Sequence, residues 1–138
     1  LRNSLAYLPQ ATDMVIDDGS GLSGKSRIRP SVLAEAISLA LITPRLASVP
    51  AGFPVAGVNG TLKDRFDDKA EKAGRNVVHA KTGTLLGVAS LAGYVTTKDG
   101  ATLAFAAMAN RAVGRDTAYN WLDRTATVLA RCGCRADG

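Results

Sequence analysis

The chain has 138 residues, of which 46% are hydrophobic and 21% charged, and it carries a formal net charge of +5. This composition is typical of a globular domain or of part of one. No apolar run reaches the roughly 18 residues that a transmembrane helix needs, so the sequence predicts no membrane span. The lysines and arginines are scattered along the chain. A nucleic-acid-binding surface gathers its positive charge into a patch or stripe, so we expect no nucleic-acid partner.

The first predicted elements are a loop and a helix. Residues 17–24 contain only Asp, Gly, Ser and Leu, which predicts a turn-rich loop. A helix begins at 29–31, where Pro30 stands in the first turn and its missing N–H costs nothing. The helix ends before 43–44, because a residue that precedes proline avoids the helical region. Six apolar residues fall on one face of this helix: Val32, Leu33, Ala36, Ile37, Ala40 and Leu41.

The next segment predicts a second loop and a charged helix. Residues 53–62 are rich in glycine, and the Asn-Gly pair at 59–60 favours a turn with positive φ. Residues 62–73 are charged and predict a helix. This helix would end near Gly74, since glycine commonly follows the last helical turn.

Downstream, the hydrophobic period changes to the alternation of β-strands. Strands are predicted over 77–83, 88–97 and 102–110, with a hairpin turn at 98–100. Three consecutive strands with short links predict an antiparallel meander. A helix over 116–131 would then pack on one face of the sheet, so the expected fold class is α+β. Its predicted inner face consists of Ala118, Trp121, Leu122, Thr125 and Leu129.

The most informative motif is Lys-Thr-Gly-Thr at the end of a predicted strand. Lys81 can set a positive charge against a substrate carboxylate, and the hydroxyls of Thr82 and Thr84 can hydrogen-bond the same group. Gly83 leaves the strand edge open to a substrate. The Thr84 N–H can donate to an oxyanion, an interaction often worth about 3–4 kcal/mol. Taken alone, the segment also fits an exposed lysine before an ordinary turn.

Lys-Thr-Gly is one of three motifs in serine acyl transferases that act on penicillins or D-alanyl peptides. The other two are Ser-x-x-Lys, which contains the nucleophile, and Ser-x-Asn. No serine in this sequence has Lys three residues later or Asn two residues later. The sequence therefore carries one of the three active-site motifs but not the nucleophile, and we expect the chain to be a piece of an enzyme.

Three segments together resemble one enzyme family. They are Asp-Gly-Ser-Gly-Leu-Ser at 18–23, Phe-Pro-Val-Ala-Gly-Val-Asn-Gly-Thr-Leu at 53–62 and His-Ala-Lys-Thr-Gly-Thr-Leu at 79–85. In order and spacing they are similar to the class C low-molecular-mass penicillin-binding proteins, the D-alanyl-D-alanine carboxypeptidase/endopeptidase family. The resemblance covers nearly the whole chain, residues 13–130. It implies a penicillin-binding, β-lactamase-like transpeptidase domain whose nucleophilic serine lies upstream.

The resemblance also implies a reaction and a set of site residues. The serine is acylated by a peptidoglycan stem peptide that ends in D-Ala-D-Ala or is cross-linked, and the acyl-enzyme is then hydrolysed. β-Lactams acylate the same serine, and no metal or organic cofactor takes part. Family members are exported and act in the periplasm or elsewhere in the extracytoplasmic cell envelope. The implied catalytic residues are Lys81 and Thr84, and the implied substrate contacts are Thr82, Gly83, Leu85 and Val58.

Residues 1–131 are accordingly expected to form the C-terminal part of the catalytic domain, and residues 132–138 a tail. The start at Leu1, without an initiator Met or signal peptide, favours absent upstream sequence. Cys132 and Cys134 are either thiols of a flexible tail or partners of cysteines in that upstream part. Because unpaired sheet edges are a liability, we expect tight association with the N-terminal part of the same protein, present upstream or as a second chain.

Two further interpretations stay open. A degenerate penicillin-recognising fold that binds peptidoglycan without cutting it would also lack the nucleophile. His79, the only histidine, shares a strand face with Lys81 and titrates near neutrality, as a general base does. A strand histidine is more often packed or hydrogen-bonded than catalytic, so we expect His79 to be structural.

Overall fold

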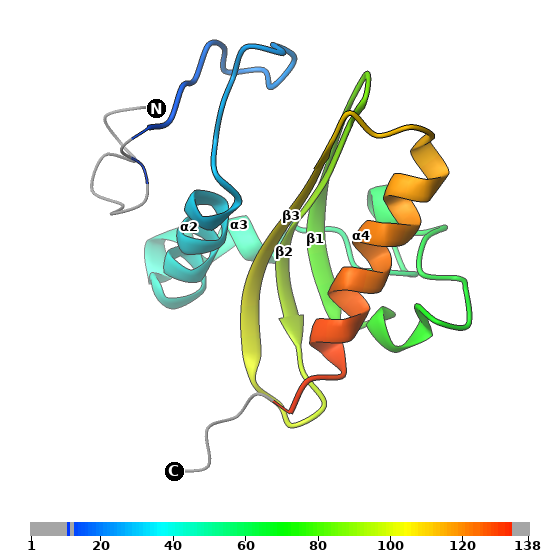
Figure 1. Cartoon of the computed structure of the whole chain (residues 1–138). Coiled ribbons are helices and arrows are strands. Elements are labelled where there is room, and N and C mark those ends of the chain that lie inside the picture. Colours follow the sequence, from blue (N-terminus) through cyan, green and yellow to red (C-terminus); the bar gives the residue numbers. More distant parts are fainter. Residues whose placement is uncertain (1–10, 12, 134–138) are drawn as a thin grey trace.

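A computed structural model describes residues 11 and 13–133, which contain a three-stranded sheet between helices (Figure 1). The strands are β1 (Val78–Leu85), β2 (Val88–Thr96) and β3 (Thr102–Asn110), and they lie in the order β1-β2-β3. Both neighbouring pairs are antiparallel. The predicted meander and the α+β fold class are therefore confirmed.

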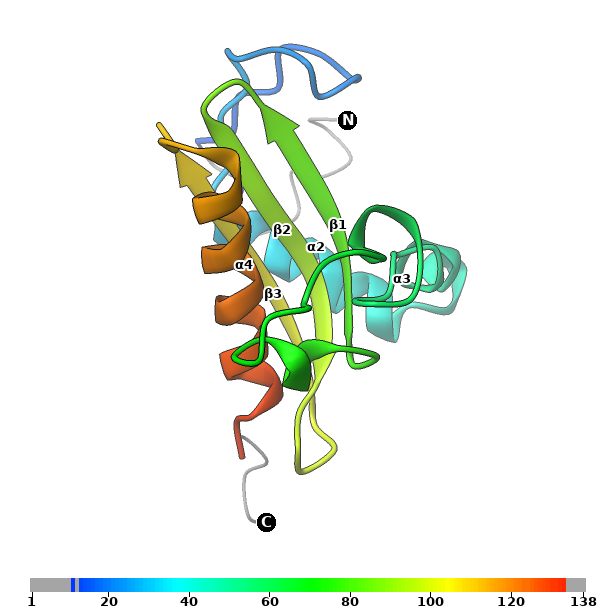
Figure 2. The same cartoon turned by 90° about the vertical axis from the view of Figure 1, so that its right-hand side faces the viewer.

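Helices cover the two faces of this sheet (Figures 1 and 2). The long helix α4 (Arg115–Ala130) packs against one face, where it contacts all three strands. On the other face α2 (Pro30–Ile42) packs chiefly against β3, and the short helix α3 (Ser48–Ala51) follows α2. Short 3-10 turns lie between the helices and strands, at η2 (Pro44–Leu46), η3 (Gly60–Leu62) and η4 (Lys72–Gly74).

Proline sets both ends of α2 where the sequence predicts them. Pro30 occupies the first turn of the helix, where its fixed φ is already helical. Thr43 ends the helix in an extended conformation, with φ −102° and ψ 111°, because Pro44 follows it.

The main core lies between the sheet and α4. Alanine and leucine recur every fourth residue along α4, at Ala118, Leu122, Ala126 and Ala130, and all four are buried. Burying a leucine completely contributes about 1.5–3 kcal/mol. They meet buried side chains of the sheet: Val78, Ala80, Ala89, Leu91, Val95 and Phe105.

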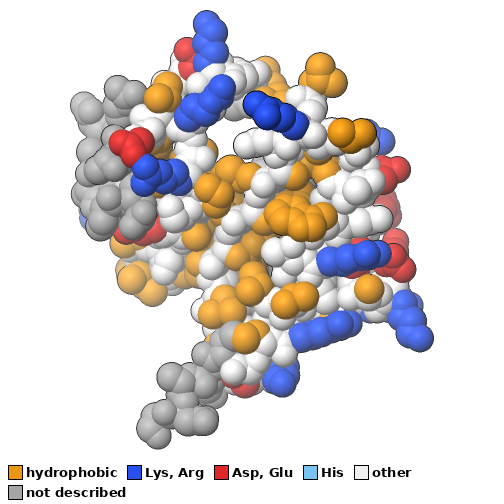
Figure 3. All heavy atoms as spheres, viewed as in Figure 1, with side chains coloured by type: hydrophobic (Ala, Val, Ile, Leu, Met, Phe, Trp, Pro, Cys, Tyr) orange, Lys and Arg blue, Asp and Glu red, His pale blue; other side chains and the backbone are white. Residues whose placement is uncertain are grey.

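The predicted inner face of α4 is partly wrong. Trp121 is 50% exposed, and Thr125 and Leu129 are only half-buried. The small alanine side chains allow the helix to lie close to the strands, and this turns Trp121 toward the rim. Hydrophobic side chains gather on the surface between α2 and α4, over β3, which is the second edge strand of the sheet (Figure 3).

The predicted helix over 62–73 is also wrong. This segment forms only the short turns η3 and η4, joined by irregular backbone. Phe66 has a φ of 62° and is 1% exposed. A left-handed residue cannot continue a right-handed helix. The backbone therefore breaks at Phe66, which places its ring in the core beside Leu62.

No single helix among the described residues is both long and apolar enough to cross a bilayer. The segment from Pro30 to Ala51 passes the test of length and composition only as two helices bent by 110°. At the C-terminus Cys132 forms a disulfide, which contradicts the interpretation of Cys132 as a free thiol. Cys134 and most of the tail predicted at 132–138 lie outside the described residues.

The close approach of β1 and β2 depends on Gly93, which pairs with Ala80. A Cβ atom at position 93 would lie 2.0 Å from the His79 carbonyl oxygen and 2.5 Å from the Ala80 Cα. Overpacking of this kind costs about 1–3 kcal/mol. We therefore expect Gly93→Ala to lower the free energy of unfolding by about 2 kcal/mol in urea titrations.

The matched control is Gly24→Ala, where the new methyl group meets nothing within 4 Å. This variant should unfold at the wild-type urea concentration or slightly above it. Equal stability of the two variants would contradict the assigned strand register.

Candidate active site

β1 is an edge strand, and only part of its outer edge is occupied. The Ala80 N–H donates to the Pro54 carbonyl at 2.9 Å, which ties the loop before η3 to the strand. Outward-pointing N–H groups recur at every second residue of a strand. Those of Thr82 and Thr84 are therefore next along the same edge. Within residues 13–133 no loop carbonyl accepts a hydrogen bond from either of these N–H groups, as the Pro54 carbonyl does from Ala80.

Strand alternation divides the Lys-Thr-Gly-Thr motif between two faces of the sheet. Lys81 and Gly83 lie on the face that carries α2, and Lys81 is exposed, with its Nζ 2.9 Å from the Thr82 carbonyl oxygen. Thr82 and Thr84 lie on the face that carries α4, opposite Leu91 and Ala89 of β2. The motif therefore presents a cation on one face, two hydroxyls on the other and N–H groups along the edge between them.

Gly83 has a packing role that the sequence does not reveal. A Cβ atom at position 83 would lie 2.4 Å from the Ser90 Oγ on β2. Ser90 in turn donates to the Gly83 carbonyl at 3.4 Å. Leu85 directly follows the motif. It is half-buried and pairs with Val88 beside the β1–β2 turn.

The loop predicted to border the site does lie against β1. The Thr82 hydroxyl donates to the Thr61 hydroxyl at 3.0 Å. Within the loop, the Asn59 side-chain oxygen accepts a hydrogen bond from the Val55 N–H at 2.8 Å. Val58 sits in this loop and is 49% exposed. The structure thus brings the loop to the motif strand, whereas the substrate-binding role of Val58 stays a prediction.

On the α4 face, Thr84 meets a residue that the sequence analysis missed. Its Oγ1 lies 3.0 Å from the Tyr119 Oη. The Arg65 guanidinium packs over the Tyr119 ring, 4.4 Å from the centroid. Arg65 is in turn bound by Asp123, with its Nη2 2.6 Å and its Nε 3.1 Å from the two carboxylate oxygens.

This ion pair is shielded from water, because the side chains of Arg65 and Asp123 are 11% and 3% exposed. Burial raises the pKa of Asp123, and the hydrogen bond and positive charge of Arg65 oppose that rise. No local pattern joins Arg65, Tyr119 and Asp123, since 54 residues or more separate Arg65 from the other two. A long-range contact of this kind leaves no signal in a single sequence.

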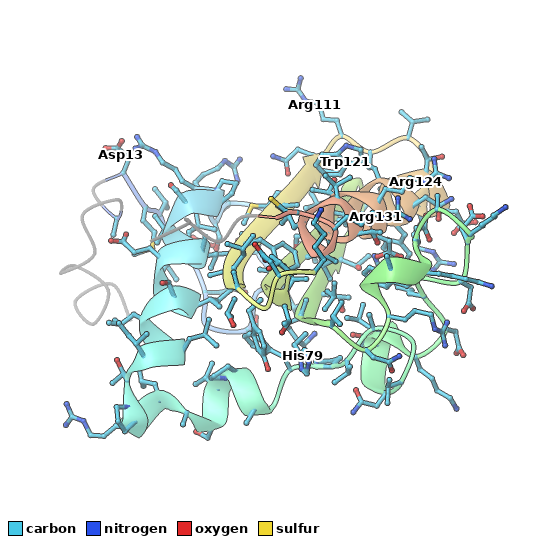
Figure 4. The ribbon with its side chains drawn as sticks, turned by 90° about the horizontal axis from the view of Figure 1, so that it is seen from below. Asp13, His79, Arg111, Trp121, Arg124 and Arg131 are labelled. Carbon is cyan, nitrogen blue, oxygen red and sulfur yellow. The ribbon has the colours of Figure 1, made fainter. Side chains whose placement is uncertain are left out.

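His79 lies on the α2 side of the sheet, away from Arg124 of α4 and from Arg131, which follows the helix (Figure 4). Its ring stacks on Tyr94 at 4.7 Å between centroids, with an interplanar angle of 12°. Burial lowers the pKa of His79. The histidine is packed, as the sequence analysis favoured. The described residues contain no group of three or more His, Cys, Asp or Glu side chains that could hold a metal ion.

The chain is similar to known carboxypeptidases. The family model of the D-Ala-D-Ala carboxypeptidase 3 (S13) family matches residues 6–132. Carboxypeptidase DacB of Mycolicibacterium smegmatis is 38% identical over 86% of the chain, and carboxypeptidase Rv3627c of Mycobacterium tuberculosis is 37% identical over 96%. The chain spans only 26% and 29% of the length of these two relatives.

A similar structure is penicillin-binding protein 4 (dacB) of Haemophilus influenzae. It superposes on 83% of this chain with a TM-score of 0.71 and 26% identity, and the match covers 26% of its own chain. The sheet and its helices therefore have the fold of the penicillin-binding proteins. The chain itself belongs to the D-Ala-D-Ala carboxypeptidase 3 (S13) family, and the resemblance inferred from its three motifs is confirmed.

The buried ion pair yields a stability prediction. Arg65→Ala leaves the Asp123 carboxylate buried without its partner, and breaking a buried pair costs about 3–5 kcal/mol. Arg29→Ala, which breaks the exposed pair with Asp13, is the control and should cost less than about 1 kcal/mol. Urea unfolding measures both variants. Similar losses in the two variants would show that burial does not govern the contribution of Arg65.

His79 yields a prediction of pH dependence. The folded protein keeps His79 neutral below its ordinary pKa of 6.5, whereas the unfolded chain protonates it there. The unfolded state then binds more protons, so the contribution of His79 to stability is lost as the pH falls from about 6.5 toward the folded-state pKa. We expect the wild-type Tm to fall more than that of His79→Gln between pH 7.5 and 5.5. Parallel pH profiles would contradict this.

Proposed function

We propose that residues 1–131 are the C-terminal part of the catalytic domain of a serine-type D-Ala-D-Ala carboxypeptidase, and that residues 132–138 are a tail. One observation carries the proposal: a member of the D-Ala-D-Ala carboxypeptidase family has its Lys-Thr-Gly-Thr motif on the open edge of a sheet. In the intact protein an upstream Ser-x-x-Lys motif supplies the nucleophile. The partner of the chain is therefore the N-terminal part of the same protein, joined to it or present as a second chain.

The proposed substrates are peptidoglycan stem peptides. The serine hydroxyl attacks the penultimate D-Ala carbonyl, and its proton passes through a nearby lysine or the Ser-x-Asn serine to the departing D-Ala amine. Water then hydrolyses the acyl-enzyme and restores the serine. The same steps cleave the D-Ala link of a cross-linked peptide, which is endopeptidase activity. No metal or organic cofactor takes part in this scheme.

Lys81 and the Thr84 backbone have separate tasks in this proposal. Lys81 attracts the terminal carboxylate of the substrate. The Thr84 N–H, on the open part of the edge, donates to the oxyanion of the tetrahedral intermediate, where fixed donors act most strongly. Around these two catalytic residues, the substrate is bordered by Thr82, Gly83, Leu85 and Val58.

β-Lactams are the proposed inhibitors, because they would acylate the same serine. Penicillin-binding protein 4 of H. influenzae has been solved in complex with a novel β-lactam. The substrate also implies a location, because peptidoglycan lies outside the cytoplasmic membrane. We therefore propose that the intact protein is exported to the periplasm or the extracytoplasmic envelope.

A second candidate is a module that binds peptidoglycan without cutting it. The absence of both Ser-x-x-Lys and Ser-x-Asn from these 138 residues would favour it if they were the natural full length. A fluorescent penicillin separates the two candidates on a denaturing gel with intact-mass measurement. Covalent label on the upstream part of the protein supports the enzyme, and a protein that takes no label supports the module.

The role of Lys81 has its own test in the intact protein. Lys81→Ala removes the charge that attracts the carboxylate, so penicillin acylation should slow at least tenfold, or about 1.4 kcal/mol of barrier. Stopped-flow fluorescence or timed gels measure the rate. The control is Lys98→Ala, at an exposed lysine in the β2–β3 turn, and it should keep the wild-type rate. An unchanged rate for Lys81→Ala would remove Lys81 from the site.

A further inference from the structure

The two threonine hydroxyls of the motif lie on the same face of β1 but differ in their partners. The Thr82 hydroxyl donates its proton to the Thr61 hydroxyl. The Thr84 hydroxyl has one partner among the described residues, the Tyr119 phenol, and either oxygen can be the donor. Thr84 is exposed, whereas Thr82 is half-buried. Thr84 is therefore the threonine of this strand whose proton is available to a ligand whenever Tyr119 is the donor.

Hydroxyl chemistry determines what the contact with Tyr119 can do. A hydroxyl carries one proton and two acceptor lone pairs, so Thr84 can accept from Tyr119 and still donate to a third group. Hydrogen bonds in such a chain polarise one another, which makes the second donor stronger. A carboxylate, which only accepts, is the matching ligand for the free proton of Thr84.

Tyr119 is held in place by two largely buried charged neighbours, Arg65 and Asp123. Arg65 packs over its ring and also donates to the Tyr119 carbonyl at 3.4 Å. Asp123, one helical turn later on α4, accepts hydrogen bonds from Arg65 with both carboxylate oxygens. A ring fixed in this way holds its hydroxyl at one point in space, which is the condition for preorganising another side chain.

We propose that Tyr119 is a positioning residue: it donates to Thr84 and thereby turns the Thr84 proton toward the terminal carboxylate of the substrate. This inference rests on the function proposed above, and it assigns to that site a residue outside the Lys-Thr-Gly-Thr motif. Tyr119 does not touch the substrate. It acts through Thr84, so its effect should depend on the presence of both the Thr84 hydroxyl and a ligand carboxylate.

The test compares two acylating agents on the intact protein, a penicillin and the methyl ester of the same penicillin, which has no carboxylate. Tyr119→Phe removes only the phenol oxygen. We expect it to slow acylation by the free acid about five- to tenfold and to leave acylation by the ester unchanged. Thr84→Val should lower the same ratio of rates. Adding Tyr119→Phe to Thr84→Val should then have no further effect on that ratio.

The matched control is Thr125→Val, which removes a hydroxyl of the same helix that bonds only its own backbone, at the Trp121 carbonyl. It should change neither rate. Equal slowing of both agents by Tyr119→Phe would identify a merely structural tyrosine and overturn the inference, as would two unchanged rates. Wild-type protein that neither agent acylates would overturn the proposed function as well, so the two failures are distinguishable.

Discussion

The site depends on one constraint, the alternation of side chains along an edge strand. Because β1 pairs with β2 on one side only, its backbone N–H groups at Thr82 and Thr84 point outward. The same alternation sends the Lys81 side chain to one face and the threonine hydroxyls to the other. A four-residue motif thus acquires three chemically distinct surfaces. On the hydroxyl face, the loop that contains Thr61 contacts Thr82, and α4 contacts Thr84.

Where local chemistry decides the structure, the sequence was sufficient to predict it. Pro30 and Pro44 mark the two ends of α2, and β3 has the bounds expected from its alternating pattern. The motif strand was also predictable, because its residue types all suit the binding of one substrate. The substrate contacts of Thr82, Leu85 and Val58 stay predictions, since geometry alone assigns no ligand to them.

Where distant segments decide the structure, the sequence was insufficient. Leu62 and Phe66 are four residues apart and look helical. Both are buried in the main core, but the backbone between them is irregular and Phe66 has a left-handed φ. Trp121 is the largest apolar residue of α4, yet the helix packs through its alanines because they permit a closer approach. The contact between Tyr119 and Thr84 exists only once α4 lies against the sheet, so no local pattern could predict it.

The hydrogen bond between Ala80 and Pro54 has a consequence for the reach of the site. A chain that adds to β1 in antiparallel fashion runs its C-terminal end toward the start of the strand, where the 54–56 segment already occupies the edge. Before Thr82, the Ala80 N–H and the Val78 carbonyl are already bonded to this segment. The 54–56 segment therefore limits the length of β1 that an added chain can pair with to the part of the edge between Thr82 and the β1–β2 turn.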